Sequence, residues 1–351
     1  MRYPSFLKKG DTIGFPAPSF GCSADPYKSA FENAMKKLQA LGYGTLPGPN
    51  AFAAKGTGIS NTPEECGREL TQMYLSDETQ ALISCGGGEL MCEILDHVDF
   101  EAIAAADPKL YMGYSDNTNM TFLLATLCDT AAVYGPCAPA FGMEPWHEAL
   151  EDALGLLEGK KLEMNGYPAY ETESLKDEEN PLVPYNAVVP RRIVPWVPGD
   201  AAAAGEALKE DIRFRGRLIG GCMDCLVNLT GTCYDRAAAF AEKYKEDGII
   251  WFLEACDLNV FSIRRALWNM KHAGWFAHTS GFLIGRPLCM GQEIMGLDQY
   301  TAVTEVLKDL EVPILMDLDI GHLPPMMPLM TGSMADVSLK GQQLSIKMEL
   351  R

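Results

Sequence analysis

The fold of this chain is decided around the stretch Lys109-Leu110-Tyr111-Met112-Gly113-Tyr114-Ser115-Asp116-Asn117-Thr118. The stretch begins with a short apolar segment, and a helical pattern follows from Asn119 to Leu127. It therefore predicts a strand, a tight turn and a helix, with Ser115 at the turn. Such a turn holds a hydroxyl group close to the N–H groups that open the helix, and a nucleophile beside oxyanion donors is what acyl transfer requires.

Ser115 has a second, simpler interpretation as the N-cap of this helix. Serine is among the residues preferred at that position, and the helix dipole favours the acidic Asp116 in the first turn. Residues 113–118 by themselves favour the capping role, so the rest of the chain has to decide between a cap and a nucleophile.

Strands and helices alternate on both sides of this turn. The expected strands are 11–16, 81–85 and 131–134, and the expected helices are 25–41, 89–97 and one that begins at the capping box of residues 62–65. This alternation predicts an open, mostly parallel sheet with helices on both faces, whose functional crevice lies at the carboxyl ends of the strands. Gly86-Gly87-Gly88 and the turn at 113–116 both follow such strand ends.

The pattern breaks down between 165 and 211, where six prolines and an acidic run at 176–179 indicate either a connector or a lid that covers a substrate with Trp196. We therefore expect a nucleophile domain (1–164), a Pro-rich insertion (165–211) and a C-terminal domain (212–351). The C-terminal domain is expected to contain strands at 218–221, 249–253, 281–284 and 312–320, helices at 261–273 and 299–310, and a β-hairpin at 337–348.

Composition argues against several classes of function. The net charge of -18 repels phosphate backbones and anionic lipid, so neither nucleic acid nor a membrane is an expected partner. No run of about 18 apolar residues is present, and residues 1–10 lack the apolar core of a signal peptide. The 11 cysteines, an odd number scattered through apolar runs, indicate reduced and buried thiols. The expected location is the cytoplasm.

A serine nucleophile needs a base, and the base needs an orienting acid. Of the five histidines, only His322 follows the end of an apolar strand and precedes a rigid Pro-Pro turn. Three acids are candidates to orient it, namely Asp317, Asp319 and Glu254, the last of which ends the strand at 249–253. The residues themselves leave the choice among the three open.

Gly86-Gly87-Gly88 is compatible with a phosphate-binding loop or with an oxyanion loop. Its spacing fails the dinucleotide-binding fingerprint, and the chain has neither a P-loop nor an H-E-x-x-H sequence.

Ser115 lacks the second glycine of G-x-S-x-G, which argues against an α/β-hydrolase. The zinc-type spacing of Cys222 and Cys225 has no second pair, so we interpret these residues as core. No metal or other cofactor is expected, and a cysteine hydrolase based on Cys85 is disfavoured because no nearby basic residue lowers its pKa.

Seven short motifs stand in order along nearly the whole chain: Leu7-Lys8-Lys9-Gly10-Asp11-Thr12, Gly86-Gly87-Gly88, Gly113-Tyr114-Ser115-Asp116, Tyr134-Gly135-Pro136, Leu253-Glu254, Gly285-Arg286 and Gly321-His322-Leu323-Pro324. Each is moderately specific, but the ordered set resembles the LD-carboxypeptidase family of serine peptidases, including its microcin C self-immunity branch.

The resemblance implies a Ser–His–Glu triad, with Ser115 as nucleophile, His322 as general base and acid, and Glu254 as the orienting carboxylate. The fold that it implies is an N-terminal flavodoxin-like parallel-sheet domain with a C-terminal β-rich α/β domain. It further implies that the triad forms across the domain interface and that the enzyme is a homodimer.

The resemblance also implies an oxyanion hole formed by the backbone N–H groups of Gly87 or Gly88 and of Asp116.

Two features depart from the murein-recycling members of the family. Residues 221–224, Gly-Cys-Met-Asp, replace their common Gly-Asn-Leu-Ser. The insertion around Trp196 is longer than theirs and is similar to the microcin branch, where an aromatic lid stacks on the substrate.

We therefore expect a serine carboxypeptidase or amidase that cleaves an amide of a small peptide-like substrate, such as a microcin C-type peptidyl or aminoacyl nucleotide. The alternatives are a murein LD-carboxypeptidase that recycles tetrapeptides and a catalytically silent ligand-binding homologue. Trp196 and Arg286 are the candidate substrate-binding residues, although Arg286 is equally compatible with a surface or interdomain ion pair.

Overall fold

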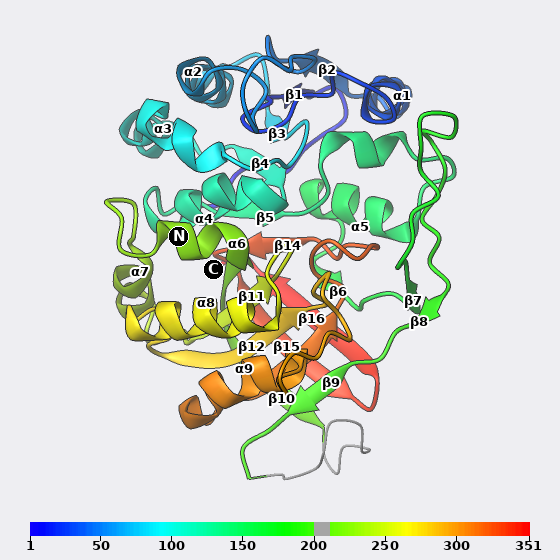
Figure 1. Ribbon diagram of the computed structural model, residues 1–351. Helices are drawn as coiled ribbons and strands as arrows, with labels where there is room; N and C mark the ends of the chain where they lie inside the picture. Colours follow the sequence, from blue (N-terminus) through cyan, green and yellow to red (C-terminus); the bar gives the residue numbers. More distant parts are fainter. Residues whose placement is uncertain (200–210) are drawn as a thin grey trace. The chain divides into compact units, whose positions relative to one another are not determined.

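The computed structural model describes residues 1–199 and 211–351, and this part of the chain divides into two compact units (Figure 1). Unit 1 comprises Met1–Lys161, Glu173–Asn186 and Pro328–Met330. Unit 2 comprises Leu162–Thr172, Ala187–Met327 and Thr331–Arg351.

Unit 1 is built on a parallel sheet whose strands are β1 (Thr12–Phe15), β2 (Gly44–Pro47), β3 (Ala81–Ile83), β4 (Leu110–Gly113) and β5 (Ala132–Tyr134). Their order is β2-β1-β3-β4-β5, with β14 (Leu329–Thr331) next to β5. The β1–β2, β1–β3, β3–β4 and β4–β5 pairs are all parallel. This 2-1-3-4-5 order is that of flavodoxin-like folds, so the predicted fold class is confirmed.

The helices of unit 1 are α1 (Tyr27–Ala40), α2 (Pro63–Leu75), α3 (Phe100–Ala105), α4 (Thr118–Thr126) and α5 (Glu148–Leu157), with shorter 3-10 segments η1 (Met91–His97), η2 (Ser115–Asn117) and η3 (Ala138–Gly142). The predicted start of α2 is confirmed, because the Thr62 side chain accepts a hydrogen bond from the Glu65 N–H and proline occupies the first turn. The helix predicted at 89–97 is instead a 3-10 segment that begins at Met91, whose N–H binds the Asp116 carboxylate.

Unit 2 is built on a mixed eight-stranded sheet in the order β6-β16-β15-β10-β11-β12-β13-β9. Its strands are β6 (Glu163–Met164), β9 (Val194–Trp196), β10 (Ile212–Cys222), β11 (Ile249–Glu254), β12 (Thr279–Gly285), β13 (Ile314–Leu318), β15 (Met334–Lys340) and β16 (Gln343–Glu349). The central strands β10 to β13 are parallel, and β15 and β16 form the predicted antiparallel hairpin.

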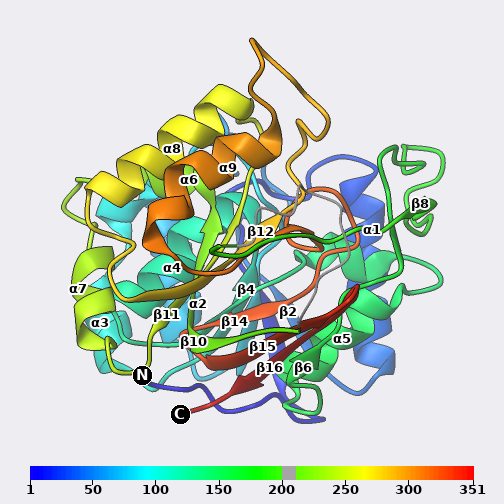
Figure 2. The ribbon, with the colours of Figure 1, turned by 90° about the horizontal axis from the view of Figure 1, so that it is seen from below.

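The helices of unit 2 are α6 (Met223–Leu229), α7 (Ala237–Lys243), α8 (Val260–His272) and α9 (Gln299–Leu307), followed by η4 (Lys308–Leu310). Asn259 caps α8 and Asp298 caps α9 through a capping box. Figure 2 shows α8 and α9 side by side. Both helices agree with the segments predicted at 261–273 and 299–310.

The Pro-rich segment is more regular than its sequence indicates. It contains β7 (Ala169–Tyr170) and β8 (Val189–Pro190), which pair with each other, and β9, which is an edge strand of the large sheet. Proline is tolerated in edge strands because its missing N–H need not join a ladder, so Pro190 and Pro195 do not prevent pairing. Residues 200–210, the last part of the predicted insertion, lie outside the described residues.

No helix in residues 1–199 or 211–351 is long and apolar enough to cross a membrane. All 11 cysteines lie in these ranges, and none forms a disulfide.

Candidate active site

Ser115 lies at the turn between β4 and α4 with its backbone in the left-handed region (φ 63°). The N-caps of η2 and α4 are Tyr114 and Asn117, and neither makes a side-chain cap hydrogen bond. The capping interpretation of Ser115 therefore does not describe this turn. A residue other than glycine costs on the order of 1–3 kcal/mol in such a conformation and keeps it only where its surroundings hold it, as at the strained turn that presents a nucleophilic serine.

Gly87 lies directly against Ser115. A Cβ atom on Gly87 would stand 2.9 Å from the Ser115 Cβ and 3.1 Å from its Oγ, so any larger residue would displace the serine. On the other side the Phe20 N–H donates to the Gly87 carbonyl at 2.9 Å. Among the residues that the structure describes, the N–H groups of Gly87 and Gly88 donate to no acceptor. Donors of this kind, beside a hydroxyl group, can stabilise a negatively charged oxygen.

The side chain of Asp116 anchors the turn. Its buried carboxylate accepts hydrogen bonds from Ser19 Oγ at 2.5 Å, the Met91 N–H at 2.8 Å and Asn119 Nδ2 at 3.1 Å. Burial raises the pKa of Asp116, and these hydrogen bonds oppose the rise. Sequence reasoning used only the backbone N–H of Asp116. The side chain also joins the Ser115 turn to the start of η1, a role that no local pattern reveals.

In unit 2, His322 and Glu254 form a hydrogen-bonded pair. Glu254 is the last residue of β11 and is fully buried, and its Oε2 lies 2.9 Å from Nδ1 of His322. Two glycines make room for it. A Cβ on Gly321 would lie 2.6 Å from the Glu254 Oε2, and a Cβ on Gly285 would lie 3.0 Å from the Glu254 Cβ. The glycines of the Gly-Arg and Gly-His motifs therefore form the walls of the slot that holds this carboxylate.

The charge of Glu254 controls the protonation of His322. Burial by itself lowers the pKa of His322, but the Glu254 carboxylate and the Cys256 thiol outweigh burial and raise that pKa above its ordinary value of 6.5. Because Nδ1 faces the carboxylate, the neutral ring keeps its proton on Nδ1 and its lone pair on Nε2. An imidazole held in this way can accept a proton at Nε2 and is stabilised when it becomes positively charged.

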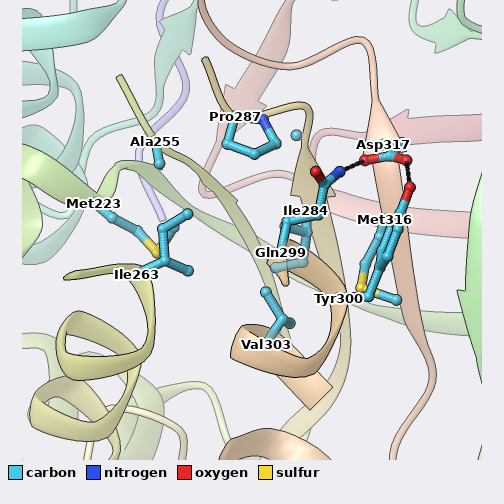
Figure 3. A pocket seen from close by; sticks show the side chains of 11 residues that line it. Met223, Ala255, Ile263, Ile284, Pro287, Gln299, Tyr300, Val303, Met316 and Asp317 are labelled. Atoms are coloured by element: carbon cyan, nitrogen blue, oxygen red, sulfur yellow. Dashed lines mark hydrogen bonds between the residues drawn. The ribbon is translucent and has the colours of Figure 1, made fainter. Parts of the chain in front are cut away.

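The other two acids considered for His322 have different partners. Asp317 accepts hydrogen bonds from Gln299 Nε2 at 2.9 Å and from the Tyr300 hydroxyl at 2.6 Å beside a small pocket (Figure 3). Asp319 forms a buried ion pair with Arg286, with 2.5 Å between Oδ1 and Nη2. The residues themselves left this choice open and the resemblance implied Glu254. Of these three acids, only Glu254 contacts His322 in the structure.

Arg286 is 1% exposed, and its guanidinium pairs with Asp319, donates to the Asp317 carbonyl at 3.0 Å and lies over the Tyr170 ring at 4.3 Å. A guanidinium that is neutralised and shielded in this way acts as an internal cross-link of unit 2. This geometry gives no support to the expectation that Arg286 binds a substrate carboxylate. Trp196, the second candidate, is partly exposed in the edge strand β9, where its ladder partner is Ile314.

Asp224, in the stretch that departs from the murein-recycling enzymes, also has a clear place. Its carboxylate accepts hydrogen bonds from the N–H groups of Cys256 at 3.0 Å and Asp257 at 2.9 Å. It therefore joins the start of α6 to the segment that follows Glu254. In the part of the chain that the structure describes, no cluster of three or more His, Cys, Asp or Glu side chains is arranged to hold a metal ion.

Comparison with known proteins identifies the family of this two-part α/β chain. Residues 13–135 match the LD-carboxypeptidase N-terminal domain, and residues 215–337 match the LD-carboxypeptidase C-terminal domain. The chain belongs to the LD-carboxypeptidase family, as the ordered motifs had indicated.

Two relatives match over most of their length. The microcin C7 self-immunity protein MccF of Escherichia coli is 26% identical over 97% of this chain and 94% of its own, and a putative carboxypeptidase of Vibrio cholerae is 25% identical over 93% and 92%. Solved structures of the microcin C7 self-immunity protein, one in complex with adenosine monophosphate and one with aspartyl sulfamoyl adenosine, have TM-scores of 0.81 and 0.80 at 22% and 23% identity. Each match covers 99% of this chain and 98% of the other, so the fold is shared throughout.

Proposed function

We propose that this chain is a serine hydrolase that cleaves an amide bond of a small peptide-like substrate, with Ser115 as nucleophile, His322 as general base and acid, and Glu254 as the orienting carboxylate. The observation that carries the proposal is the left-handed conformation of Ser115 against Gly87, because a strained serine beside N–H groups without acceptors is costly unless it serves chemistry. The His322–Glu254 pair supplies the second half of the machinery.

In the proposed reaction, the Ser115 Oγ attacks the amide carbonyl carbon while Nε2 of His322 takes its proton. The negative charge that develops on the carbonyl oxygen is stabilised by the N–H groups of Gly87 or Gly88 and of Asp116. The imidazolium then returns the proton to the leaving amine. In the second half of the reaction a water molecule gives a proton to Nε2 of His322 and attacks the acyl carbon, and the proton passes to the Ser115 Oγ as its bond to the acyl group breaks. This mechanism requires Ser115 of unit 1 and His322 of unit 2 to meet in the working enzyme, and it requires a neutral His322 at the start.

For the substrate, we propose an aminoacyl or peptidyl nucleotide with an amide linkage. Structures of the related self-immunity protein with adenosine monophosphate and with aspartyl sulfamoyl adenosine support this class. Trp196 is the proposed stacking partner for the base, since a partly exposed indole offers an aromatic face at low entropic cost. The proposal also keeps the homodimer expected from the sequence, which sedimentation of the purified protein tests.

The experiment compares hydrolysis of two substrates by the wild type and by Ser115→Ala. One substrate is aspartyl sulfamoyl adenosine, and the other is a murein tetrapeptide that ends in D-alanine. The proposal is supported in full if the enzyme hydrolyses aspartyl sulfamoyl adenosine, if Ser115→Ala abolishes this activity, and if Trp196→Ala raises its KM. If the enzyme hydrolyses only the tetrapeptide, the mechanism stands and the substrate is a murein peptide instead of a nucleotide.

A fluorophosphonate probe tests the mechanism without any substrate, because it reacts covalently with an activated serine. Labelling of the wild type but not of Ser115→Ala supports the proposed nucleophile. If the protein binds adenosine monophosphate but shows neither labelling nor turnover, the proposed hydrolase activity is wrong. The chain would then be a catalytically silent ligand-binding homologue.

A further inference from the structure

The side chain of Asn117 connects two segments of unit 1, the Gly86–Gly87 peptide and the Ser115 turn, whose relative orientation matters for the proposed mechanism. Asn117 is fully buried, and its Nδ2 donates to the Gly86 carbonyl at 2.7 Å and to the Tyr114 carbonyl at 3.1 Å. Its Oδ1 accepts a hydrogen bond from the Tyr111 hydroxyl at 2.5 Å. One carboxamide therefore contacts the glycine segment, the residue before Ser115 and the strand β4.

The contact with Gly86 determines where the next N–H group points. The Gly86 carbonyl accepts hydrogen bonds from both Asn117 Nδ2 and Ser84 Oγ, the latter at 3.0 Å. In a planar trans peptide the carbonyl and the following N–H point in opposite directions, so fixing the Gly86 oxygen also fixes the Gly87 N–H. That N–H belongs to the residue that lies against Ser115, and it donates to no acceptor within the described ranges.

The contact with Tyr114 acts on the nucleophile itself. The Tyr114 carbonyl accepts hydrogen bonds from the side chain of Asn117 at 3.1 Å and from its N–H at 3.2 Å. The other end of the same peptide unit, the Ser115 N–H, donates to the Tyr134 hydroxyl at 3.2 Å. The peptide that enters Ser115 is thus held on both sides, which sustains the left-handed φ of 63°.

We propose that Asn117 is the positioning residue of this site: its carboxamide holds the Gly86–Gly87 peptide and the Ser115 turn in the relative orientation that oxyanion stabilisation requires. Tyr111 acts through it, because a hydroxyl that donates to Oδ1 turns Nδ2 toward the two carbonyl groups. The proposal rests on the proposed role of Ser115, but its structural half concerns the orientation of one peptide and is testable without catalysis.

Asn117→Asp is the sharpest test. Aspartate has the shape of asparagine and still accepts from Tyr111, but it places an oxygen where Nδ2 donates to two carbonyls. Since an oxyanion donor displaced by a fraction of its contact distance loses much of its effect, we expect kcat to fall by about 30- to 100-fold with KM changed by less than about twofold. Tyr111→Phe frees the carboxamide to rotate, and we expect a smaller loss in kcat, of about three- to tenfold.

Asn117→Leu and Asn50→Leu form a matched pair. Asn50 is also a buried asparagine of unit 1, but its Nδ2 contacts Glu69 and the Glu65 carbonyl on α2. Both variants are expected to lose stability, and only Asn117→Leu is expected to lose kcat per folded molecule. Equal losses of kcat in the two variants would show that any buried hydrogen bond in unit 1 matters equally, and this would overturn the proposal.

A crystal structure of Asn117→Leu separates this inference from the proposed function. We expect the Gly86–Gly87 peptide to rotate away from its orientation in the wild type. A peptide that keeps its orientation overturns the inference even if kcat falls. A peptide that rotates supports it even if the wild type neither turns over an amide nor reacts with a fluorophosphonate, an outcome that would instead remove the proposed function.

Discussion

The serine turn of unit 1 and the histidine–glutamate pair of unit 2 are built in different ways. Ser115 is held by residues close to it in sequence, Tyr114 and Asn117, together with the glycine segment at 86–88. Glu254 and His322 are 68 residues apart in the chain. β12 separates β11 from β13 in the sheet, and the loop after β13 reaches Glu254 past Gly285 at the end of β12. The strained turn thus combines neighbouring residues with a distant glycine segment, whereas the acid–base pair depends wholly on the packing of distant strand ends.

The serine turn and the histidine–glutamate pair also lower the stability of the fold in different ways. The turn holds backbone strain on the order of 1–3 kcal/mol at Ser115. The pair holds a fully buried carboxylate, which is tolerated because it is hydrogen-bonded to an imidazole. Substitutions at the turn should therefore raise stability when they relieve strain, and substitutions at the pair should change the response to pH.

The largest effect is expected at the turn itself. Ser115→Ala should lower kcat by about 10⁴- to 10⁶-fold, because the nucleophile and its base act as a unit. Ser115→Gly should abolish activity equally and raise the free energy of unfolding by about 0.5–1 kcal/mol, because glycine adopts the left-handed conformation without strain. Steady-state kinetics and urea unfolding check both parts, and a glycine variant that is less stable than the alanine variant would contradict the claim of strain.

Glu254→Gln tests the pair. Only the neutral imidazole accepts a proton, so activity should rise as the pH increases through the pKa of His322, which the Glu254 carboxylate raises. Removing that charge lowers the pKa of His322, so the acidic limb of the kcat/KM profile should move to lower pH. In addition, kcat should fall by about 10³- to 10⁴-fold, because the glutamine side chain no longer holds the ring proton of His322 on Nδ1.

Asp317→Asn is the matched control, because Asp317 binds Gln299 and Tyr300 rather than the histidine. It should leave the acidic limb where it is in the wild type. If the acidic limb does not move in Glu254→Gln, or moves equally in Asp317→Asn, then Glu254 does not set the pKa of His322.

Gly87→Ala tests the contact between the glycine segment and the turn. A Cβ at 2.9 Å from the Ser115 Cβ forces the two segments apart, so kcat should fall by about 10²-fold while the protein stays folded. Gly155→Ala is the matched control within α5. Its Cβ would lie 3.1 Å from the Lys161 Cβ and would add no atom next to the serine turn, so it should leave kcat unchanged. Full activity of Gly87→Ala in a protein of normal stability would argue against an oxyanion role for this segment.

The smallest effect on activity is expected at Arg286. Arg286→Met leaves Asp319 buried without its main partner and should lower the free energy of unfolding by about 3–5 kcal/mol, and the double variant with Asp319→Asn should regain part of this loss. Thermal unfolding measures the loss. The kcat and KM of the folded fraction should stay close to those of the wild type, whereas a large rise in KM without a loss of stability would restore Arg286 as a substrate-binding residue.

Local patterns were sufficient wherever neighbouring residues decide the structure. The parallel sheet of unit 1, the capped helix at Thr62, the two long helices of unit 2 and the terminal hairpin follow from periodicity, caps and turns. They were not sufficient in the Pro-rich segment, because strands such as β9 form through pairing with the edge of a distant sheet. The same limit explains why Arg286 was considered a ligand, since nothing near it in sequence reveals its ion pair with Asp319.

The sequence by itself determined that a serine stands at a strand–turn–helix corner, that a glycine segment ends a neighbouring strand, and that a histidine follows another strand end. Its ordered motifs also determined the family. The resemblance implied Glu254 as the partner of His322, and the tertiary structure shows that contact. Only the tertiary structure decided that the side chains of Asp116 and Asn117 hold the serine turn and that Arg286 is an internal cross-link. The physical reason is that a hydrogen bond depends on a few tenths of an ångström between atoms from distant parts of the chain, and strand register and packing set that distance while local composition does not.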